Sequence, residues 1–246
     1  MSLQLDTATI STRPLVSPKP PECPGCPGAR SGFCHAAIAA TALPPAHQRA
    51  TKAHRNVYVA GQRIESMTVI CEGWATRYVQ LSDGRRQILS ILLPGDPISP
   101  SALFKDSLDF SVQSLTPVRT CHYDRDRMRG RMPHETNLLE AIIALFTAER
   151  EQADRSLIDL GQRPADERIA RFFLQLLHRL RVRGLAEGQT FACPLRQRHI
   201  ADAMGLTAVH VNRIIGHFRR AGLMDAADGR VTILNLADLR HVANLK

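Results

Sequence analysis

The sequence predicts an α+β protein in three parts: a small antiparallel β-roll, one long helix and a C-terminal winged helix-turn-helix. Short strand-like runs separated by turn signals fill the first half of the chain. An apolar stripe with helical spacing follows from Pro133, and two helices joined by a glycine turn lie near the C-terminus. The expected parts are a flexible leader with a cysteine-rich segment (1–50), the β-roll (51–132), the long helix (133–161) and the winged helix-turn-helix (162–246).

The β-roll is expected because strand-like runs recur from Val57 to Tyr123. Asp83-Gly84 stands between Trp74–Leu81 and Arg85–Leu93, and this dipeptide is a strong signal for a two-residue hairpin. Several short strands with turns every eight to twelve residues are typical of a small β-roll or jelly roll.

The long helix carries an apolar stripe at spacings of three, four and seven residues. We call this stripe the seam, and its members are Leu139, Ile143, Phe146, Ala153, Leu157 and Leu160. A seam of this length fits a helix that packs on a second copy, although a helix packed on its own β-roll would show the same pattern. Glu149 and Arg150 interrupt the seam at its middle, so we expect two-stranded association to be marginal. Gly161 and Pro164 mark the boundary to the next helix.

Near the C-terminus, Ile200–Met204 and Ala208–Ala221 read as helices on either side of a tight turn, with Thr207 as N-cap of the second. Asp228-Gly229 joins two short strands into a wing. The start of the second helix presents Val209, His210, Asn212 and Arg213 outward. Such a helix fits the major groove of DNA, where Arg213 can make a bidentate contact with guanine and Asn212 can pair with adenine. Contacts with phosphates are expected from Arg198, His199, Arg219, Arg220 and Arg230.

The charge distribution favours the same partner. Residues 161–246 hold 14 Lys and Arg against 7 Asp and Glu, and residues 1–160 hold 18 against 16. Most of the net charge of +9 therefore lies in the last third, as expected of a domain that binds a polyanion. No apolar run is long enough to span a membrane and no secretory signal is present, so we expect a cytoplasmic protein with reduced cysteines.

Three cysteines, Cys23, Cys26 and Cys34, gather in a segment rich in proline and glycine. This segment has too little apolar content to bury them, and closely spaced accessible thiols normally bind a metal or react. A tripod of this kind lacks one ligand. The candidates for the fourth position are Cys71, Cys121, Cys193 and His35. The local chemistry leaves both zinc and an iron–sulfur cluster open.

Taken together, these stretches resemble the Crp/Fnr family of bacterial transcription regulators over about residues 20–240. The resemblance is carried by Asp83-Gly84-Arg85-Arg86-Gln87 through Leu93-Pro94-Gly95-Asp96, by Asp166-Glu167-Arg168-Ile169-Ala170, and by Gly205-Leu206-Thr207 to Arg213. It implies a β-roll like that of cyclic-nucleotide-binding domains and a homodimer formed across the long helix. It further implies binding to a palindromic promoter site and contact with RNA polymerase.

The cysteines are similar to those of the oxygen-sensing Fnr branch, in which four cysteines hold a [4Fe–4S] cluster. This resemblance implies that Cys23, Cys26, Cys34 and Cys121 are the ligands, that the intact cluster favours the dimer, and that oxygen degrades it. The alternatives within the same class are that the cysteines bind zinc or form a thiol switch. The alternative from another class of protein is a small metal-dependent enzyme. Against the enzyme reading, His134-Glu135 lacks a second histidine at the spacing of metalloproteases.

Two departures from the family pattern affect the expected ligands. The Fnr recognition helix typically has Glu, Ser and Arg at its base-reading positions, whereas this chain has Val209, Asn212 and Arg213. The expected guanine contact survives, but the rest of the operator sequence does not carry over. In the region of the family's cyclic-nucleotide phosphate cradle, the chain has Asp109 and no arginine. We therefore expect no cyclic nucleotide to bind.

Overall fold

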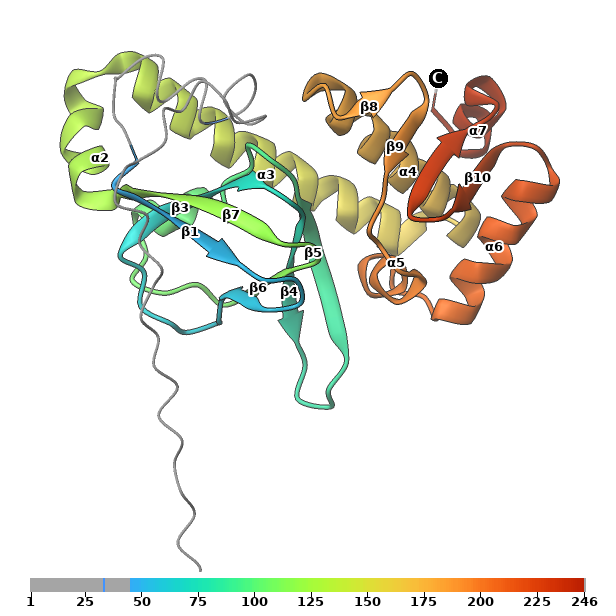
Figure 1. The fold of residues 1–246 in the computed structure, drawn as a ribbon, viewed down its shortest axis with the longest axis horizontal. Helices are drawn as coiled ribbons and strands as arrows, with labels where there is room; N and C mark the ends of the chain where they lie inside the picture. Colours follow the sequence, from blue (N-terminus) through green and yellow to red (C-terminus); the bar gives the residue numbers. More distant parts are fainter. Residues whose placement is uncertain (1–32, 34–44, 246) are drawn as a thin grey trace, which may run out of the picture.

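The computed structural model describes Phe33 and residues 45–245, and it contains the three predicted parts in the predicted order (Figure 1). The β-roll lies on the left of Figure 1, and the long helix crosses behind it towards the winged helix-turn-helix on the right.

Two antiparallel sheets form the β-roll. One sheet has the order β1-β7-β3 and consists of β1 (His47–Thr51), β7 (Val118–Asp124) and β3 (Ser66–Glu72). The other has the order β2-β6-β4-β5 and consists of β2 (Asn56–Tyr58), β6 (Ser111–Ser114), β4 (Ala75–Gln80) and β5 (Arg86–Leu92). Ile70, Leu92, Val112 and Val118 belong to the apolar core of the β-roll, and their burial stabilises it. The predicted hairpin at Asp83-Gly84 is present between β4 and β5, with Gly84 at φ +85°. Its loop is longer than the two residues predicted, because the last strand pair is Gln80 with Arg86 and the Leu81 N–H bonds to the Arg85 carbonyl.

The β-roll begins earlier than residue 51, because β1 starts at His47 and pairs with β7 along its whole length. From the sequence, residues 47–50 were expected to belong to the leader (1–50). β1 is an edge strand whose residues are half-buried or exposed, so it lacks the apolar alternation that marks a strand. A short helix, α2 (Arg125–Arg131), was also not predicted; the Asp124 carboxylate caps it by accepting the Arg127 N–H at 2.7 Å.

The long helix α3 (Thr136–Gln162) follows the 3-10 turn η4 (Met132–His134). Its buried residues are Leu138, Ile142 and Asp159, which lie off the predicted seam. All six seam residues are exposed on the single chain: Leu139, Ile143, Phe146, Ala153, Leu157 and Leu160. The stripe therefore does not serve to pack α3 on its own β-roll.

One seam prediction is wrong. Glu149 does not interrupt the seam, because its carboxylate accepts hydrogen bonds from Arg77 of β4 and from the Ser99 hydroxyl, and so faces the β-roll. Arg150 is exposed and pairs with Asp154 one turn later at 3.0 Å. Arg150 is thus the single charge at the middle of the seam among the described residues of α3.

The winged helix-turn-helix starts with α4 (Ala165–Val182), whose apolar face is buried by the rest of the domain. The motif itself is α5 (Gln197–Met204) and α6 (Ala208–Arg220), joined at Gly205 in the left-handed conformation, φ +63°. The predicted wing is the hairpin of β10 (Met224–Ala227) and β11 (Arg230–Ile233). The sequence did not predict three short elements: β8 (Ala186–Glu187), β9 (Thr190–Ala192) and α7 (Leu236–Val242).

An ion cluster joins the β-roll to α4. The Asp96 carboxylate accepts hydrogen bonds from Arg179 at 2.6 Å and from Arg183 at 2.5 Å, and also from the Leu93 N–H at 2.8 Å. The two arginines further donate to the backbone carbonyls of Ile91 and Pro94. Such charge-assisted hydrogen bonds fix the orientation of α4 on the β-roll.

Candidate functional site

Helix α6 presents its first turns outward because its other face is anchored. Val211, Ile214, Ile215 and Phe218 are buried in the domain core. Thr207 caps the helix as predicted, since its hydroxyl accepts the His210 N–H at 3.2 Å. The predicted base-reading side chains therefore lie on an open face: Val209 is 80% exposed, His210 is half-buried, and Asn212 and Arg213 are exposed.

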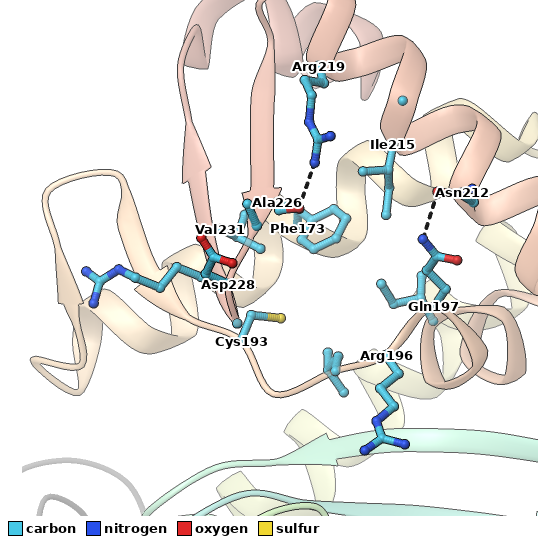
Figure 2. A pocket seen from close by; sticks show the side chains of 16 residues that line it. Phe173, Cys193, Arg196, Gln197, Asn212, Ile215, Arg219, Ala226, Asp228 and Val231 are labelled. Carbon is cyan, nitrogen blue, oxygen red and sulfur yellow. Dashed lines mark hydrogen bonds between the residues drawn. The ribbon is translucent and has the colours of Figure 1, made fainter.

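Asn212 has a partner that the sequence did not reveal. The Gln197 amide at the start of α5 donates to the Asn212 Oδ1 at 2.8 Å, as Figure 2 shows. This bond fixes the orientation of the Asn212 amide, and a carbonyl oxygen keeps a second lone pair for another donor. Gln197 is therefore a positioning residue for the predicted adenine contact. No local pattern in the sequence brings these two residues together.

A cavity of about 250 Å³ lies between α6, the start of α5 and the wing. Its basic lining residues are Arg196, Arg219 and Arg230, of which Arg196 was not predicted. Arg219 braces the wing by donating to the Ala226 carbonyl at 2.8 Å (Figure 2) and also to Asp225 at 2.7 Å. The cavity thus has three arginines and one carboxylate, Asp228, on its wall beside the recognition helix, and Arg219 and Arg230 are also paired with Asp225 and Glu187. Arginine is a common contact for DNA phosphates.

Cys193 lies on the wall of this cavity, with its sulfur directed inward (Figure 2). Burial raises the pKa of this thiol to about 11. Cys193 lies in the core of the DNA-binding domain, whereas Phe33, the neighbour of Cys34 in the chain, shares a different apolar cluster with Cys121. Cys193 therefore fits the role of a small buried side chain better than that of the fourth metal ligand.

The structure corrects the expectation for His199. This residue is 6% exposed, and its Nδ1 accepts the Arg196 N–H at 3.1 Å, which closes the first turn of α5. Burial and the nearby charges of Arg198 and Arg196 lower the pKa of His199 to about 4. His199 is therefore a neutral cap of the helix and does not face a phosphate.

This cap gives a pH dependence to the DNA-binding domain. The pKa of His199 in the folded state lies below its ordinary value of 6.5, so the unfolded chain takes up the proton first. The stability contributed by neutral His199 is complete above pH 6.5 and is lost as the pH falls towards 4. In His199→Gln, the glutamine can accept the same N–H but does not titrate. We expect its melting temperature to decline less than that of the wild type over this pH range. Part of the decline should remain, because burial also lowers the pKa of His122 in β7 to about 4. Parallel declines of the two proteins would contradict this role.

The predicted fourth metal ligand, Cys121, lies in the middle of β7 and is 1% exposed. Its sulfur accepts a hydrogen bond from the Gln48 amide at 3.1 Å, and the Cys71 thiol is 2.6 Å away. Phe33, the residue that precedes Cys34 in the chain, is buried in the same apolar cluster and packs edge-on against Tyr123. The other predicted ligands, Cys23, Cys26 and Cys34, lie outside the described residues.

The described part of the chain alone does not form a metal site. Within Phe33 and residues 45–245, no three His, Cys, Asp or Glu side chains gather to hold an ion. The surroundings of Cys121 nevertheless fit a cluster ligand, because hydrogen bonds to the ligating sulfur and an apolar shell are the features that tune such centres. Among the described residues, Gln48 and Cys71 donate to this sulfur, and neither contact follows from the sequence pattern.

In the region where the family has its cyclic-nucleotide phosphate cradle, the side chains of this chain contact one another or solvent. Arg77 bonds to Glu149 and lies over the Phe110 ring at 4.9 Å. Asp109 points to solvent and pairs with Lys105 at 3.4 Å. The absence of cyclic-nucleotide binding stays a prediction. Among the described helices, none is long and apolar enough to cross a membrane.

Comparisons with known proteins agree with this architecture. Residues 167–242 match the Crp-like helix-turn-helix domain, and residues 48–133 match the cyclic nucleotide-binding domain. The chain is 30% identical over 175 residues to the nitrogen fixation regulation protein FixK of Bradyrhizobium diazoefficiens. The matched region covers 71% of this chain and 72% of the relative. The chain is 26% identical to the fumarate and nitrate reduction regulatory protein of Vibrio cholerae, covering 78% of this chain and 76% of the relative.

The transcriptional activator protein FnrL of Cereibacter sphaeroides is 24% identical, over 90% of both chains. Among solved structures, FixK2 from Bradyrhizobium japonicum has a TM-score of 0.72 at 23% identity and covers 79% of this chain and 96% of that chain. At this identity the structural likeness shows the fold alone.

Proposed function

This chain belongs to the Crp/Fnr family of transcription regulators, and we propose that it senses oxygen or redox state through a cysteine-ligated [4Fe–4S] cluster. In this proposal the cluster controls dimerisation and promoter binding. Members of the family are DNA-binding dimers and not enzymes. The relatives bear both FixK and Fnr names, so the names alone do not decide the sensor chemistry. The observation that carries the proposal is the buried Cys121 sulfur, which accepts hydrogen bonds from Gln48 and Cys71 and shares an apolar cluster with Phe33.

The proposed ligand set is Cys23, Cys26 and Cys34 of the N-terminal segment together with Cys121. A [4Fe–4S] cluster held there would supply an iron centre that oxygen can oxidise. Gln48 orients the Cys121 sulfur by a hydrogen bond. Phe33, the residue next to Cys34 in the chain, is buried in the same apolar cluster as Cys121. Occupancy of this site would thus tie the leader to strand β7.

The same cluster of side chains links the site to the dimer seam. Leu138 and Ile142 of α3 are buried together with Cys121, and their sequence neighbours Leu139 and Ile143 are seam residues. A change in packing around Cys121 would therefore move the first turns of the seam. Further along α3, a groove of about 940 Å³ is lined by Ala153, Leu157 and Leu160 together with β5 and α4. It leaves room for the helix of a second copy.

In the proposed dimer, two copies of α6 read the halves of a palindromic site. The Arg213 side chains meet guanine, the Asn212 side chains meet adenine, and the cavity beside α6 takes a phosphate. RNA polymerase is the proposed partner at the promoter, and a chromosomal target places the protein in the cytoplasm.

The test is an absorption spectrum with iron, sulfide and zinc assays on full-length protein purified without oxygen. We expect about four irons per chain and a brown colour that bleaches in air. Cys121→Ser should lose the iron, whereas Cys193→Ser, which alters a cysteine of the other domain, should retain it. A zinc-loaded or colourless wild-type protein would overturn the cluster and leave the DNA-binding function intact.

A further inference from the structure

Cys71 and Cys121 form a pair of thiols across two neighbouring strands. Cys71 lies near the end of β3 and Cys121 in the middle of β7, and their sulfurs are 2.6 Å apart. The register of the two strands shifts between Ile70 and Glu72, the residues on either side of Cys71. This irregularity brings Cys71 towards Cys121, although the direct cross-strand neighbour of Cys121 is Val69.

The surroundings hold the two sulfurs in place. Both residues are 1% exposed, and both belong to the apolar cluster that contains Met67, Tyr123 and Phe33. A disulfide bond has a length of about 2.05 Å, so the sulfurs need to approach by only about half an ångström.

We propose that Cys71 and Cys121 are a redox-active dithiol that a peroxide oxidises to a cross-strand disulfide, and that this disulfide withdraws Cys121 from the metal-ligand set. The first half of the proposal stands on the thiol pair alone. The second half rests on the proposed function, because it requires Cys121 to be a ligand.

The chemistry balances with hydrogen peroxide as the oxidant. The sulfur of one thiol attacks a peroxide oxygen and the O–O bond breaks; the departing hydroxide takes the proton of this thiol and leaves as water, and the sulfur becomes a sulfenic acid. The sulfur of the second thiol attacks the sulfenic sulfur, the S–S bond forms and the S–O bond breaks; the departing hydroxide takes the proton of the second thiol and leaves as a second water. The two thiols lose two electrons and two protons in total, and the peroxide is reduced to two waters.

The two states of Cys121 exclude each other. A sulfur in a disulfide has no thiolate to offer to iron, so an oxidised chain cannot rebuild the centre until a thiol reductant restores both cysteines. The pair would therefore keep the regulator inactive after a peroxide exposure, even when iron and sulfide are plentiful. Cys193, the other described cysteine, belongs to the DNA-binding domain and takes no part.

The test treats full-length, metal-free protein with hydrogen peroxide, alkylates it under denaturing conditions and digests it with trypsin. Residues 64–77 and 120–125 are expected as tryptic peptides, each with one cysteine of the pair. We expect these peptides to appear linked after peroxide and to separate after dithiothreitol. The linked species should be lost in Cys71→Ser and kept in the matched variant Cys193→Ser. Unlinked, alkylated Cys71 and Cys121 in folded, peroxide-treated wild type would overturn the dithiol.

Iron uptake tests the second half. Peroxide-treated wild type should take up iron and sulfide only after dithiothreitol, whereas treated Cys71→Ser should take them up without it once its other thiols are shown to be reduced. Equal uptake by untreated and linked wild-type protein would overturn the withdrawal of Cys121. If reduced wild type takes up no iron at all, the cluster proposal fails, and the linked peptides still decide the dithiol.

Discussion

An aspartate in place of Phe146 is expected to leave the protein monomeric and to abolish its binding to a palindromic site. Phe146 is 37% exposed on the single chain, and its ring lies 6.0 Å from that of Phe104, which is 51% exposed. The two rings therefore form an apolar patch on the seam with no cover in one chain. In a dimer across α3, the substitution removes two aromatic side chains from the interface and introduces two unpaired carboxylates. Changes of this kind cost about 3–5 kcal/mol or more, which weakens dimerisation by at least a factor of roughly a hundred to a thousand.

Sedimentation of the metal-loaded and metal-free variant checks this result. Ala144→Asp is the matched control, because Ala144 is exposed on α3 away from the seam and receives the same charge. The control should behave like the wild type in sedimentation and in DNA binding. A stable Phe146→Asp dimer would show that the interface lies elsewhere.

In the proposed function the dimer depends on the cluster, and the location of Arg150 would account for that dependence. Arg150 is the charge that falls within the seam, and in a symmetric pair it would lie near its own copy. Asp154 on the same helix offsets part of that repulsion at 3.0 Å, but both side chains are largely exposed, so the offset is small. An additional bias from the Cys121 site, transmitted through Leu138 and Ile142, would then be enough to shift the equilibrium.

The parts of the fold that the sequence predicted are those with a strong local period or an obligatory turn residue. The seam, the Asp83-Gly84 hairpin and the turn at Gly205 all depend on neighbours in the sequence, and the structure contains them. β1 was missed because a half-exposed edge strand has no clear period. Glu149 was placed on the wrong face because periodicity shows that a polar residue interrupts a stripe but does not show that Arg77 lies opposite.

The candidate site was predicted unevenly for the same reason. The outward face of α6 follows from the helical period, and Val209 and Arg213 are exposed as expected. His199 looked like a phosphate ligand beside Arg198, because the helix was expected to start only at Ile200. The helix α5 starts at Gln197, so His199 lies in its first turn and accepts the Arg196 N–H. The pairing of Cys71 with Cys121 depends on strand register and on an irregularity in β3, and neither is written in the local sequence.

Replacing Arg213 by alanine is expected to weaken binding at the specific site by about 1–3 kcal/mol for each half-site, and therefore by about twice that for a symmetric dimer. Arg213 is exposed on the first half of α6, beside Asn212, which Gln197 holds in place. A guanidinium there can donate two parallel hydrogen bonds to the O6 and N7 of guanine, and alanine leaves both acceptors unpaired. The loss should be concentrated at one base pair in each half-site, so changing that base pair should cost the wild type much and the variant little.

Arg198→Ala is the control that separates base reading from phosphate contact. Arg198 is exposed at the first turn of α5, and we expect its loss to weaken specific and random DNA alike and to reduce the salt dependence of binding. Titrations of both variants on the palindrome, on its single-base variants and on random duplex measure the difference. Equal weakening of Arg213→Ala on all of these duplexes would mean that Arg213 contacts the DNA backbone. In that case α6 would read bases through Val209 and Asn212, the two positions at which this chain departs from the Fnr pattern.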